Sequence, residues 1–583
     1  MSEFFEVLEQ RVWPFVNRPA RYIGNEYGLV RKAPESVRLR AAFVYPDLYE
    51  VGMSNLGLKV LYRVANSIDS VAAERSFVPW PDMEKLMRLH GVPLYSLETY
   101  SALSDFDLLG ITLQSELTYT NVLAVLDLAG IPLESGRRDS GRWPLVAGGG
   151  PCAVNVRPLE RFFDFFLLGD GEDAFREIAG ALLSLETDGK EYTRAGKLEV
   201  LGSLEGVYVP PGRTGSPGPV RVRRVFDLKT SDAPDGLPVP LIEVAQHNYV
   251  VELMRGCTVG CRFCQAGMYY RPVRVRPPGQ VADLVRQGVR SGGWESVTLL
   301  SLSSADYPAI EELVDELMPE IQGSGLTLSF PSLRVDESTL RLLERISGAK
   351  RSGLTFAVEA GSERLRRVIG KKVIEDDLVN LVTRVFTSGW TLVKLYFMVG
   401  LPTETGQDVD DIARLINRMA AIGRSVPGRH NVNVTLSPFV PKPCTPFQWE
   451  AQDDPGSILE KFDRIRSQVR TRRVRFKCHD PWAAVIEGVL CRGGSELGSV
   501  LRTAWAGGAR LDGWSEHFDF AVWEKAFQEH GLDWRALLAE TSDTMELPWK
   551  TVDAPVTESF LKQQREAGLQ GQIVRDCDGG PCL

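Results

Sequence analysis

The sequence predicts an α/β protein with an N-terminal doubly wound parallel sheet, a central partial (β/α)6 barrel and a small, mainly helical C-terminal region. Short apolar runs alternate with amphipathic stretches over residues 37–186, and the same alternation resumes over residues 242–438. Such strand–helix alternation is typical of parallel sheets whose connecting helices cover them. Past residue 480 the patterns are helical and include six of the twelve tryptophans, which favours a small core packed on aromatic rings over a substrate platform.

The composition is that of an ordinary globular protein. Its 583 residues are 44% hydrophobic and 25% charged, and this length suits about three or four domains. A net charge of -9 gives no overall field that would coat nucleic acid. No run of eighteen apolar residues occurs, and the start, MSEFFEVLEQ, lacks a basic-then-apolar signal peptide. We therefore expect a cytoplasmic protein with no membrane contact, whose nine cysteines are too few for a disulfide scaffold.

The first domain is expected over residues 37–186, after a lead-in (residues 1–36) with a helix at 4–16. A ligand of a doubly wound sheet lies over the carboxyl ends of the strands. Gly149, Gly150 and Gly171 stand at such ends, where glycine lets backbone approach a ligand, although glycines after strands are also ordinary turns. The expected strands are 39–45, 108–113, 145–147 and 165–168, and the expected helices are 56–67, 117–129 and 172–183.

Residues 187–240 are rich in Pro and Gly and predict a linker with a small hairpin or an edge strand. The barrel and the segment that leaves it are expected at 241–476, followed by the C-terminal region at 477–583. Chemistry in such barrels belongs to the C-terminal ends of the strands. The expected barrel strands are 249–254, 296–300, 326–330, 353–358, 392–398 and 432–436.

Three cysteines directly follow the first barrel strand. Cys257, Cys261 and Cys264 have a C-x3-C-x2-C spacing, and soft thiolate ligands select zinc, copper(I) or iron–sulfur clusters. A structural zinc site needs four protein ligands, and no second C-x2-C pair occurs. A cubane of four irons held by three cysteines instead leaves one iron with an open position, which favours chemistry at that iron.

This stretch, RGCTVGCRFCQAGMY, resembles the radical S-adenosylmethionine (SAM) superfamily, whose hallmark C-x3-C-x-aromatic-C is matched by Phe263 before Cys264. The resemblance implies a 4Fe–4S cluster whose unique iron is chelated by the amino and carboxylate groups of SAM. It also implies an electron donor such as flavodoxin or ferredoxin. Reductive cleavage of SAM would then give a 5′-deoxyadenosyl radical that abstracts hydrogen from a substrate, which the sequence does not name.

A doubly wound domain ahead of such a barrel is similar to the cobalamin-binding type of that superfamily, in an uncharacterised branch. The resemblance implies a cobalamin on the first domain, with Gly149, Gly150 and Gly171 as candidate contacts and methyl transfer as the favoured outcome. The chain departs from the pattern in one respect. It has no D-x-H-x-x-G, and the only histidine of this domain, His90, lies in a helical stretch. A cofactor-free domain is the alternative.

Further candidate SAM contacts stand at other strand ends of the barrel. Ser303 follows the second strand, where relatives often carry Gly-Gly-Glu, and Arg334 follows the third, where it could hold a carboxylate or cap a helix. Glu359 is costly to bury without a role or a partner, and its position resembles one that contacts SAM in relatives. Gly400 and Glu404 follow the fifth strand, in a segment similar to the one below the adenine, although Glu404 could equally open a helix.

Each of three further features allows two interpretations. Lys394, in the fifth strand, points either into the barrel or outward. Cys577 and Cys582 flank a Gly-rich turn in the tail, which either binds a metal or a cluster or is a frayed end. A basic stripe could engage RNA phosphates or form a solvated face. It consists of Arg470, Arg472, Arg473, Arg475 and Lys477.

The favoured function is a radical SAM enzyme acting on an unknown substrate. The alternative from another class is an iron–sulfur binding or sensor protein without turnover that contacts RNA or protein. Methylthiolation of tRNA or ribosomal protein is the third interpretation. Such enzymes hold a second cluster on three cysteines of the N-terminal domain, however, and here only Cys152 precedes Cys257.

Overall fold

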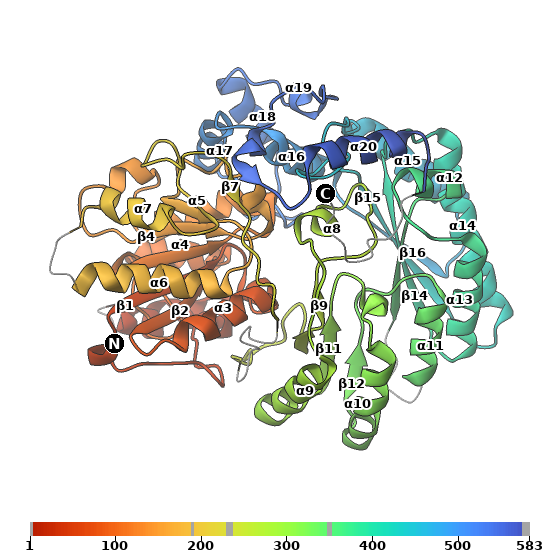
Figure 1. Cartoon of the computed structure of the whole chain (residues 1–583), viewed down its shortest axis with the longest axis horizontal. Helices are drawn as coiled ribbons and strands as arrows, with labels where there is room; N and C mark the ends of the chain where they lie inside the picture. Colours follow the sequence, from red (N-terminus) through yellow and green to blue (C-terminus); the bar gives the residue numbers. More distant parts are fainter. Residues whose placement is uncertain (1–3, 188–191, 229–236, 347–352, 574–583) are drawn as a thin grey trace. The chain divides into compact units, whose positions relative to one another are not determined.

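The protein, seen as a computed structural model, divides into two compact units (Figure 1), and the structure describes residues 4–187, 192–228, 237–346 and 353–573. The first unit consists of Met1–His247, Leu490–Asp533 and Glu546–Asp553, and the second of Asn248–Val489, Trp534–Met545 and the chain from Ala554 on. These bounds differ from the predicted ones in two places. The predicted linker belongs to the first unit, and the C-terminal region is divided between both units.

The first unit is built on a six-stranded sheet in the order β2-β1-β3-β4-β5-β6. β1 to β5 are parallel and β6 is antiparallel to β5, so the predicted doubly wound parallel sheet is confirmed. The strands are β1 (Leu39–Tyr45), β2 (Val71–Phe77), β3 (Leu108–Thr112), β4 (Leu145–Gly149), β5 (Phe165–Leu167) and β6 (Val207–Tyr208). The helices are α2 (Tyr49–Gly52), α3 (Leu56–Asn66), α4 (Pro81–His90), α5 (Tyr119–Leu128), α6 (Glu172–Thr187) and α7 (Arg194–Gly202).

Strand β2 was not among the predicted strands, because charged residues interrupt its apolar pattern. Glu74 and Arg75 are buried within it, and Arg75 pairs with Glu26 at 3.1 Å and with Glu98 at 2.7 Å. A buried charge is tolerated only where partners of opposite sign surround it. Those partners come from distant segments of the chain, so the residues of the strand alone do not reveal it.

The ends of this unit also differ from prediction. α7 and β6 lie in the predicted linker, and β7 (Val220–Arg221) pairs in parallel with β17 (Val552–Asp553), far along the chain. The expected lead-in helix is broken into α1 (Phe5–Val7), η1 (Leu8–Val12) and η2 (Trp13–Phe15). Pro14 lacks the N–H that a continuing α-helix needs.

The second unit is a partial parallel barrel made of two sheets, with the orders β12-β11-β8 and β13-β14-β15-β16. A bridge between Leu333 and Phe356 joins the segment after β12 to β13. Within these two sheets all neighbouring strands are parallel, and the six expected barrel strands are confirmed. The strands are β8 (Tyr249–Glu252), β11 (Ser296–Leu300), β12 (Thr327–Ser329), β13 (Leu354–Glu359), β14 (Leu392–Val399), β15 (Asn431–Pro438) and β16 (Val474–Cys478).

Helices cover one face of the sheet β13–β16, and Figure 1 shows α13 and α14 along it. Val393, Leu395 and Phe397 of β14 are buried against this side, and the residues between them are not. Alternate residues of a strand point to opposite faces. The helices are α9 (Pro278–Gly292), α10 (Ile310–Ser324), α11 (Glu337–Arg345), α12 (Glu363–Val368), α13 (Glu375–Thr387), α14 (Gly406–Ser425) and α15 (Pro455–Gln468).

The C-terminal part is mainly helical, as predicted. Trp523, Trp534 and Trp549 are buried, so these rings pack in cores. No helix in the described part of the chain combines the length and the apolar character that a membrane span requires. Cys577 and Cys582 lie outside the described residues. The helices are α16 (Pro481–Arg492), α17 (Leu497–Ala506), α18 (Phe520–Glu529), α19 (Trp534–Leu538) and α20 (Glu558–Leu569).

Asp408 fixes the start of α14 and ties it to the segment after β13. Its carboxylate accepts hydrogen bonds from the N–H and hydroxyl of Thr405, at 2.8 and 2.6 Å, and from Arg364 and Ser362. Burial alone would raise the pKa of Asp408, but these donors lower it from 3.8 to about 2.

Asp408 is therefore expected to make the protein acid-sensitive between about pH 4 and pH 2. A carboxylate whose pKa is lowered by folding stabilises the native state above its unfolded pKa and loses that contribution as the pH falls through its folded pKa. The contribution is about 2 kcal/mol. We expect Asp408→Asn to lower the melting temperature at pH 6 and to show a smaller further decrease toward pH 2.5 than the parent. Equal pH profiles of the two proteins would contradict this role.

Candidate active site

The loop with the three cysteines begins where the first strand of the second unit ends. β8 leads into β9 (Met254–Arg255), and the loop connects β9 with α8 (Gln265–Tyr269). Gly256 opens the loop with a φ of +82°. A Cβ at this position would stand 2.8 Å from the carbonyl oxygen of Tyr270, so only glycine fits. The cysteines therefore lie at the C-terminal ends of the barrel strands, where such barrels place their chemistry.

The three thiols, Cys257, Cys261 and Cys264, are largely withdrawn from water. The Cys264 sulfur accepts a hydrogen bond from the Gly267 N–H at 3.3 Å and so caps α8. Burial raises the pKa of all three thiols, that of Cys261 to about 12. Uncompensated thiolates are thus disfavoured at this place, and nearby positive charge, such as that of bound iron, is needed to stabilise them.

The donor set fits an iron–sulfur cluster by its chemistry. In the part of the chain that the structure describes, no three His, Cys, Asp or Glu side chains are grouped so that they could hold one metal ion. A 4Fe–4S cluster bonds each thiolate to a different iron, so its ligands need not converge on one point. Three soft thiolates on one loop match such a cluster with one iron left open.

Arg262 anchors the loop between the second and third cysteines. It is buried, and its guanidinium donates to the carbonyl oxygens of Arg367 and Val368 at 2.9 Å and of Gln572 at 3.0 Å. Gly568 of α20 packs so closely that a Cβ there would stand 2.7 Å from the Arg262 side chain. The C-terminal helix of this unit therefore packs on the cysteine loop.

Phe263, the aromatic residue of the motif, packs on a buried apolar cluster of the same unit. The cluster draws on α12 and on the segments after β13, β14 and β15, so the strand ends are fastened together beneath the loop. Its buried members are Ala360, Leu365, Val368, Ile369, Leu401, Phe439 and Phe447.

Removing the Arg262 anchor is expected to loosen the loop even without a cofactor. Arg262→Leu would leave three carbonyl groups without their donor, of which that of Val368 is buried, and this costs about 2 kcal/mol of local stability. We expect faster hydrogen exchange over residues 257–264 and 366–370 of the cluster-free protein. Arg472→Leu, which removes an exposed arginine, should leave the exchange unchanged. Equal exchange in both variants would show that Arg262 does not hold the loop.

Glu359 ends β13 in an unusual backbone conformation. Its φ is +69°, and the register between β13 and β14 shifts next to it. Positive φ raises the conformational free energy of any residue other than glycine, and such backbone strain concentrates at functional sites. The Glu359 carboxylate lies 3.6 Å from the Lys371 ammonium. Burial raises the pKa of the Glu359 carboxyl, and Lys371 acts in the opposite direction.

Lys371 brings positive charge to both the carboxylate and the thiols. Burial alone would lower its pKa, but the charges of Cys261, Glu359 and Cys264 raise it above its usual value. The same ammonium favours the thiolate forms of Cys257, Cys261 and Cys264. A carboxylate and an ammonium group therefore stand together beside the cysteine loop.

Contacts within the chain explain why glycine and serine follow Glu359. A Cβ on Gly361 would stand 2.3 Å from the backbone nitrogen of Ile412 in α14, so the two segments touch only because this residue is glycine. Ser362 caps α12 through the Leu365 N–H at 3.1 Å and donates to Asp408. These contacts hold Glu359 at the mouth of the barrel.

The loop after β11 contributes Ser303 and Asp306. Ser303 is buried, and within the described residues its hydroxyl has no hydrogen-bond partner. Asp306 accepts from the Thr258 hydroxyl of the cysteine loop at 2.7 Å and from Arg334 at 2.6 Å. Arg334 thus already has a carboxylate partner within the chain, and this contact connects the segment after β12 with the loop after β11.

Gly400 and Glu404 contact each other after β14. The Gly400 N–H donates to the Glu404 carboxylate at 2.9 Å, and Lys461 pairs with that carboxylate at 2.7 Å. Thr405 caps α14 instead, so Glu404 does not open that helix. Burial raises the pKa of Glu404, and one of its oxygens has no partner among the described residues.

Glycines at the strand ends of the first unit pack closely against the chain itself. A Cβ on Gly150, whose φ is +124°, would stand 2.7 Å from the carbonyl oxygen of Leu113. One on Gly171 would stand 3.0 Å from the Leu61 side chain, whereas Gly149 has room for a Cβ at 3.6 Å from its nearest neighbour. Internal packing therefore accounts for glycine at positions 150 and 171.

Residues 491–517 lie against these strand ends. Trp514 donates to Asp47, after β1, at 2.9 Å, and the Cys491 thiol to Glu116, after β3, at 2.8 Å. Asn155, after β4, donates to two carbonyl groups of this stretch at 2.9 and 3.0 Å. The edge at which a doubly wound sheet binds its ligands is thus in contact with the chain itself. His90 is the last residue of α4, as its helical pattern indicates.

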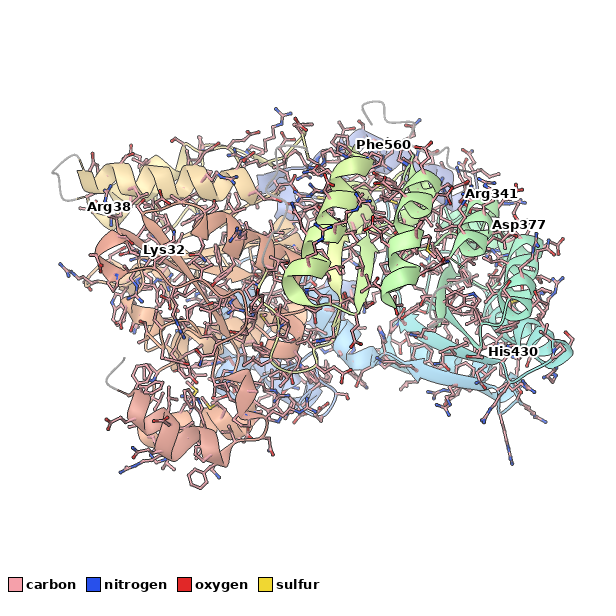
Figure 2. All side chains as sticks on the ribbon, turned by 90° about the horizontal axis from the view of Figure 1, so that it is seen from below. Lys32, Arg38, Arg341, Asp377, His430 and Phe560 are labelled. Carbon is pink, nitrogen blue, oxygen red and sulfur yellow. The ribbon has the colours of Figure 1, made fainter. Side chains whose placement is uncertain are left out.

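Part of the basic stripe is engaged within the chain. Arg473 donates to the carbonyl oxygens of Gly423 and His430 at 3.2 Å each, and Figure 2 marks His430. Arg271, just after the cysteine loop, lies over the ring of Phe560, 5.7 Å from its centroid. Arg475 and Lys477 of β16 stay exposed.

Three residues of this site were not among the predicted ones: Arg262, Asp306 and Lys371. Arg262 stands inside the cysteine motif, but nothing in the sequence shows that three carbonyl groups surround it. Lys371 follows a glycine and precedes a second lysine, so the pattern does not separate it from a surface residue. Only the fold brings Lys371 to Glu359 and to the thiols.

Comparison with known proteins identifies both units. Residues 57–210 match the family described as "Radical SAM proteins, N-terminal", and residues 251–416 match the "Radical SAM superfamily". An uncharacterized protein of Methanocaldococcus jannaschii is 30% identical over 467 residues, which cover 79% of this chain and 90% of that protein. A tRNA-2-methylthio-N(6)-dimethylallyladenosine synthase of Chloroflexus aurantiacus is 23% identical over 338 residues, or 55% of this chain and 65% of the relative.

Solved structures with a similar fold at low sequence identity include the following one. It is the radical S-adenosylmethionine methyltransferase TsrM from Kitasatospora setae, described with cobalamin and a [4Fe-4S] cluster bound. The TM-score is 0.51 at 14% identity, and the match covers 70% of this chain and 77% of TsrM. At this identity the likeness concerns the fold.

Proposed function

Because the chain belongs to the radical SAM superfamily, we propose that Cys257, Cys261 and Cys264 hold its 4Fe–4S cluster and that Glu359 and Lys371 hold SAM beside it. The observation that carries the proposal is the Glu359–Lys371 pair, which stands next to the three thiols at the strand ends. When bound, the cluster supplies one electron to SAM and so starts radical chemistry.

The charges of the site match the amino-acid end of SAM. That end carries an ammonium and a carboxylate, and the site offers a carboxylate, Glu359, and an ammonium, Lys371. Burial strengthens both interactions, because the local dielectric is low. The unpartnered Ser303 hydroxyl adds a donor on the neighbouring loop. Gly400 and Glu404 shape the loop after β14, and Arg334 braces the loop after β11 through Asp306.

The test is SAM cleavage by the anaerobically reconstituted full chain with dithionite as reductant. We expect 5′-deoxyadenosine and methionine in equal amounts, even without a substrate. In the cell we propose a flavodoxin or ferredoxin as the electron donor. A protein that carries the cluster and binds SAM but releases no 5′-deoxyadenosine would instead support the sensor interpretation.

The fold of TsrM favours a second candidate, cobalamin-dependent methyl transfer. At the described strand ends of the first unit, Gly150 and Gly171 pack against the chain itself and residues 491–517 contact that edge, so of the three candidate glycines only Gly149 has room beside it. The test is to supplement the protein with hydroxocobalamin and then to desalt it. If the protein retains corrin absorption, methyl transfer is supported. If the corrin absorption is lost, the protein performs radical SAM chemistry without cobalamin.

Methylthiolation of tRNA is not favoured, although a synthase of that type matches part of the chain. Cys152, the only cysteine before Cys257, is buried in the first unit, so the described residues of that unit offer no second set of three thiols like the one that methylthiotransferases carry. The basic stripe also has one cation fewer for binding RNA phosphates, because the Arg473 guanidinium donates to backbone carbonyl groups.

A further inference from the structure

The face of the sheet β13–β16 that its helices leave uncovered carries an unusual set of side chains. Strand register places Lys394, Asn433 and Arg475 side by side on β14, β15 and β16, and places Tyr396, Thr435 and Lys477 in the next row. We call these six residues the cationic inner face. On β14 and β15 they alternate with buried residues, and on β16 they alternate with half-buried ones, so they point to the concave side of the barrel.

The cationic inner face settles the direction of Lys394. The buried neighbours of Lys394, Val393 and Leu395, face the helices, so Lys394 points into the barrel. Neighbouring strands lie about 4.8 Å apart, and successive rows on one face about 6.6 Å apart. Three cations, one aromatic ring and two hydrogen-bonding side chains thus share an area of small-molecule size.

None of the six side chains makes a hydrogen bond or an ion pair with another described residue. On the outer surface of the same unit, by contrast, Arg414 pairs with Glu375 and Arg464 pairs with Asp410. The four strands contain one carboxylate, Glu359, and Lys371 is its partner. The positive charge of the inner face is therefore not balanced within the sheet.

We propose that the cationic inner face binds the substrate, and that the substrate is a small anion with a phosphate or carboxylate group. Arg475 and Lys394 suit such a group, because charge-assisted hydrogen bonds to planar or tetrahedral oxyanions are strong and directional. The Tyr396 ring, 40% exposed, offers a surface for an apolar or aromatic part of the molecule. That the bound anion is the substrate rests on the proposed function. The same sheet carries Glu359 at its C-terminal edge, toward which the substrate must present its reacting atom.

The test uses the full, cluster-loaded chain with SAM and two probes, inorganic pyrophosphate and citrate, in calorimetric titrations at low ionic strength. We expect one probe to bind and thereby to show whether the anion is a phosphate or a carboxylate. Lys394→Gln and Arg475→Gln should each weaken binding about tenfold, and Arg475→Lys should weaken it less. Arg472→Gln is the matched control, since it removes an exposed arginine of the same segment that lies outside the strand.

Binding of neither probe by the parent protein would overturn the proposal, as would equal affinities in Arg475→Gln and in the control. Binding of single-stranded RNA in place of both probes would also overturn it. Release of 5′-deoxyadenosine is measured in the same samples. If SAM cleavage fails while the anion still binds to the inner face, the proposed function is wrong and the site remains. If SAM is cleaved but no anion binds, the proposed function stands and the proposed anion site is wrong.

Discussion

Cys261→Ala is expected to lose the cluster and with it all cleavage of SAM. Two thiolates cannot replace three on a loop whose buried position already disfavours the thiolate form, since burial raises the pKa of Cys261 to about 12 without bound iron. Iron and sulfide per chain should fall to background, and so should 5′-deoxyadenosine. Cys257→Ala and Cys264→Ala should behave in the same way.

Cys478→Ala is the matched control for these variants. Cys478 lies in β16 on the side of the helices, where its sulfur accepts from Arg466 at 3.1 Å. It should keep the full iron content and the parent rate. The cluster assignment fails if a Cys261→Ala protein retains the parent's iron–sulfide absorption, or if the parent itself carries zinc in place of iron and sulfide.

Lys371→Met is expected to weaken SAM binding about tenfold to a hundredfold while the cluster stays in place. The substitution keeps an unbranched side chain one atom shorter and removes the charge that would hold the SAM carboxylate. The loss of one charged hydrogen bond weakens binding by about this factor. Glu359→Gln should act similarly through the amino group. The measurement is a titration of SAM into the cluster-loaded protein, with iron determined on the same samples.

Lys372→Met is the control for Lys371, because it removes the adjacent lysine, which is exposed. It should leave the dissociation constant of SAM unchanged. An unchanged constant in Lys371→Met, with full iron content, would show that Lys371 acts on Glu359 and the loop only and does not touch SAM.

Elements with clear apolar periodicity could be predicted from the sequence, and those stabilised by distant charges could not. β1, β11 and β14 have continuous or alternating apolar runs and appear within a residue or two of their expected bounds. β2 contains Glu74 and Arg75, whose partners lie in other segments. β16 alternates apolar residues with Arg475 and Lys477, and on the sequence alone its cations formed a basic stripe.

The candidate site divides in the same way. The cysteine motif is local in the sequence, so its spacing and its position after a strand could be recognised directly. Glu359 was predicted from its place at a strand end, but its partner Lys371 follows a whole helix, α12. Arg334 was a candidate either to hold a carboxylate, as a contact of SAM, or to cap a helix, and in the structure it contacts the Asp306 carboxylate within the chain.

The sequence by itself determined a spacing of three thiols that suits a cluster, at the end of the first strand of a parallel barrel. Thiolate spacing and strand periodicity are encoded by neighbouring residues, which is why they can be read without a structure. Only the tertiary structure decided what surrounds the thiols and which face Lys394 takes. Those facts depend on strand register and on contacts between segments distant in the chain, which residue order alone does not fix.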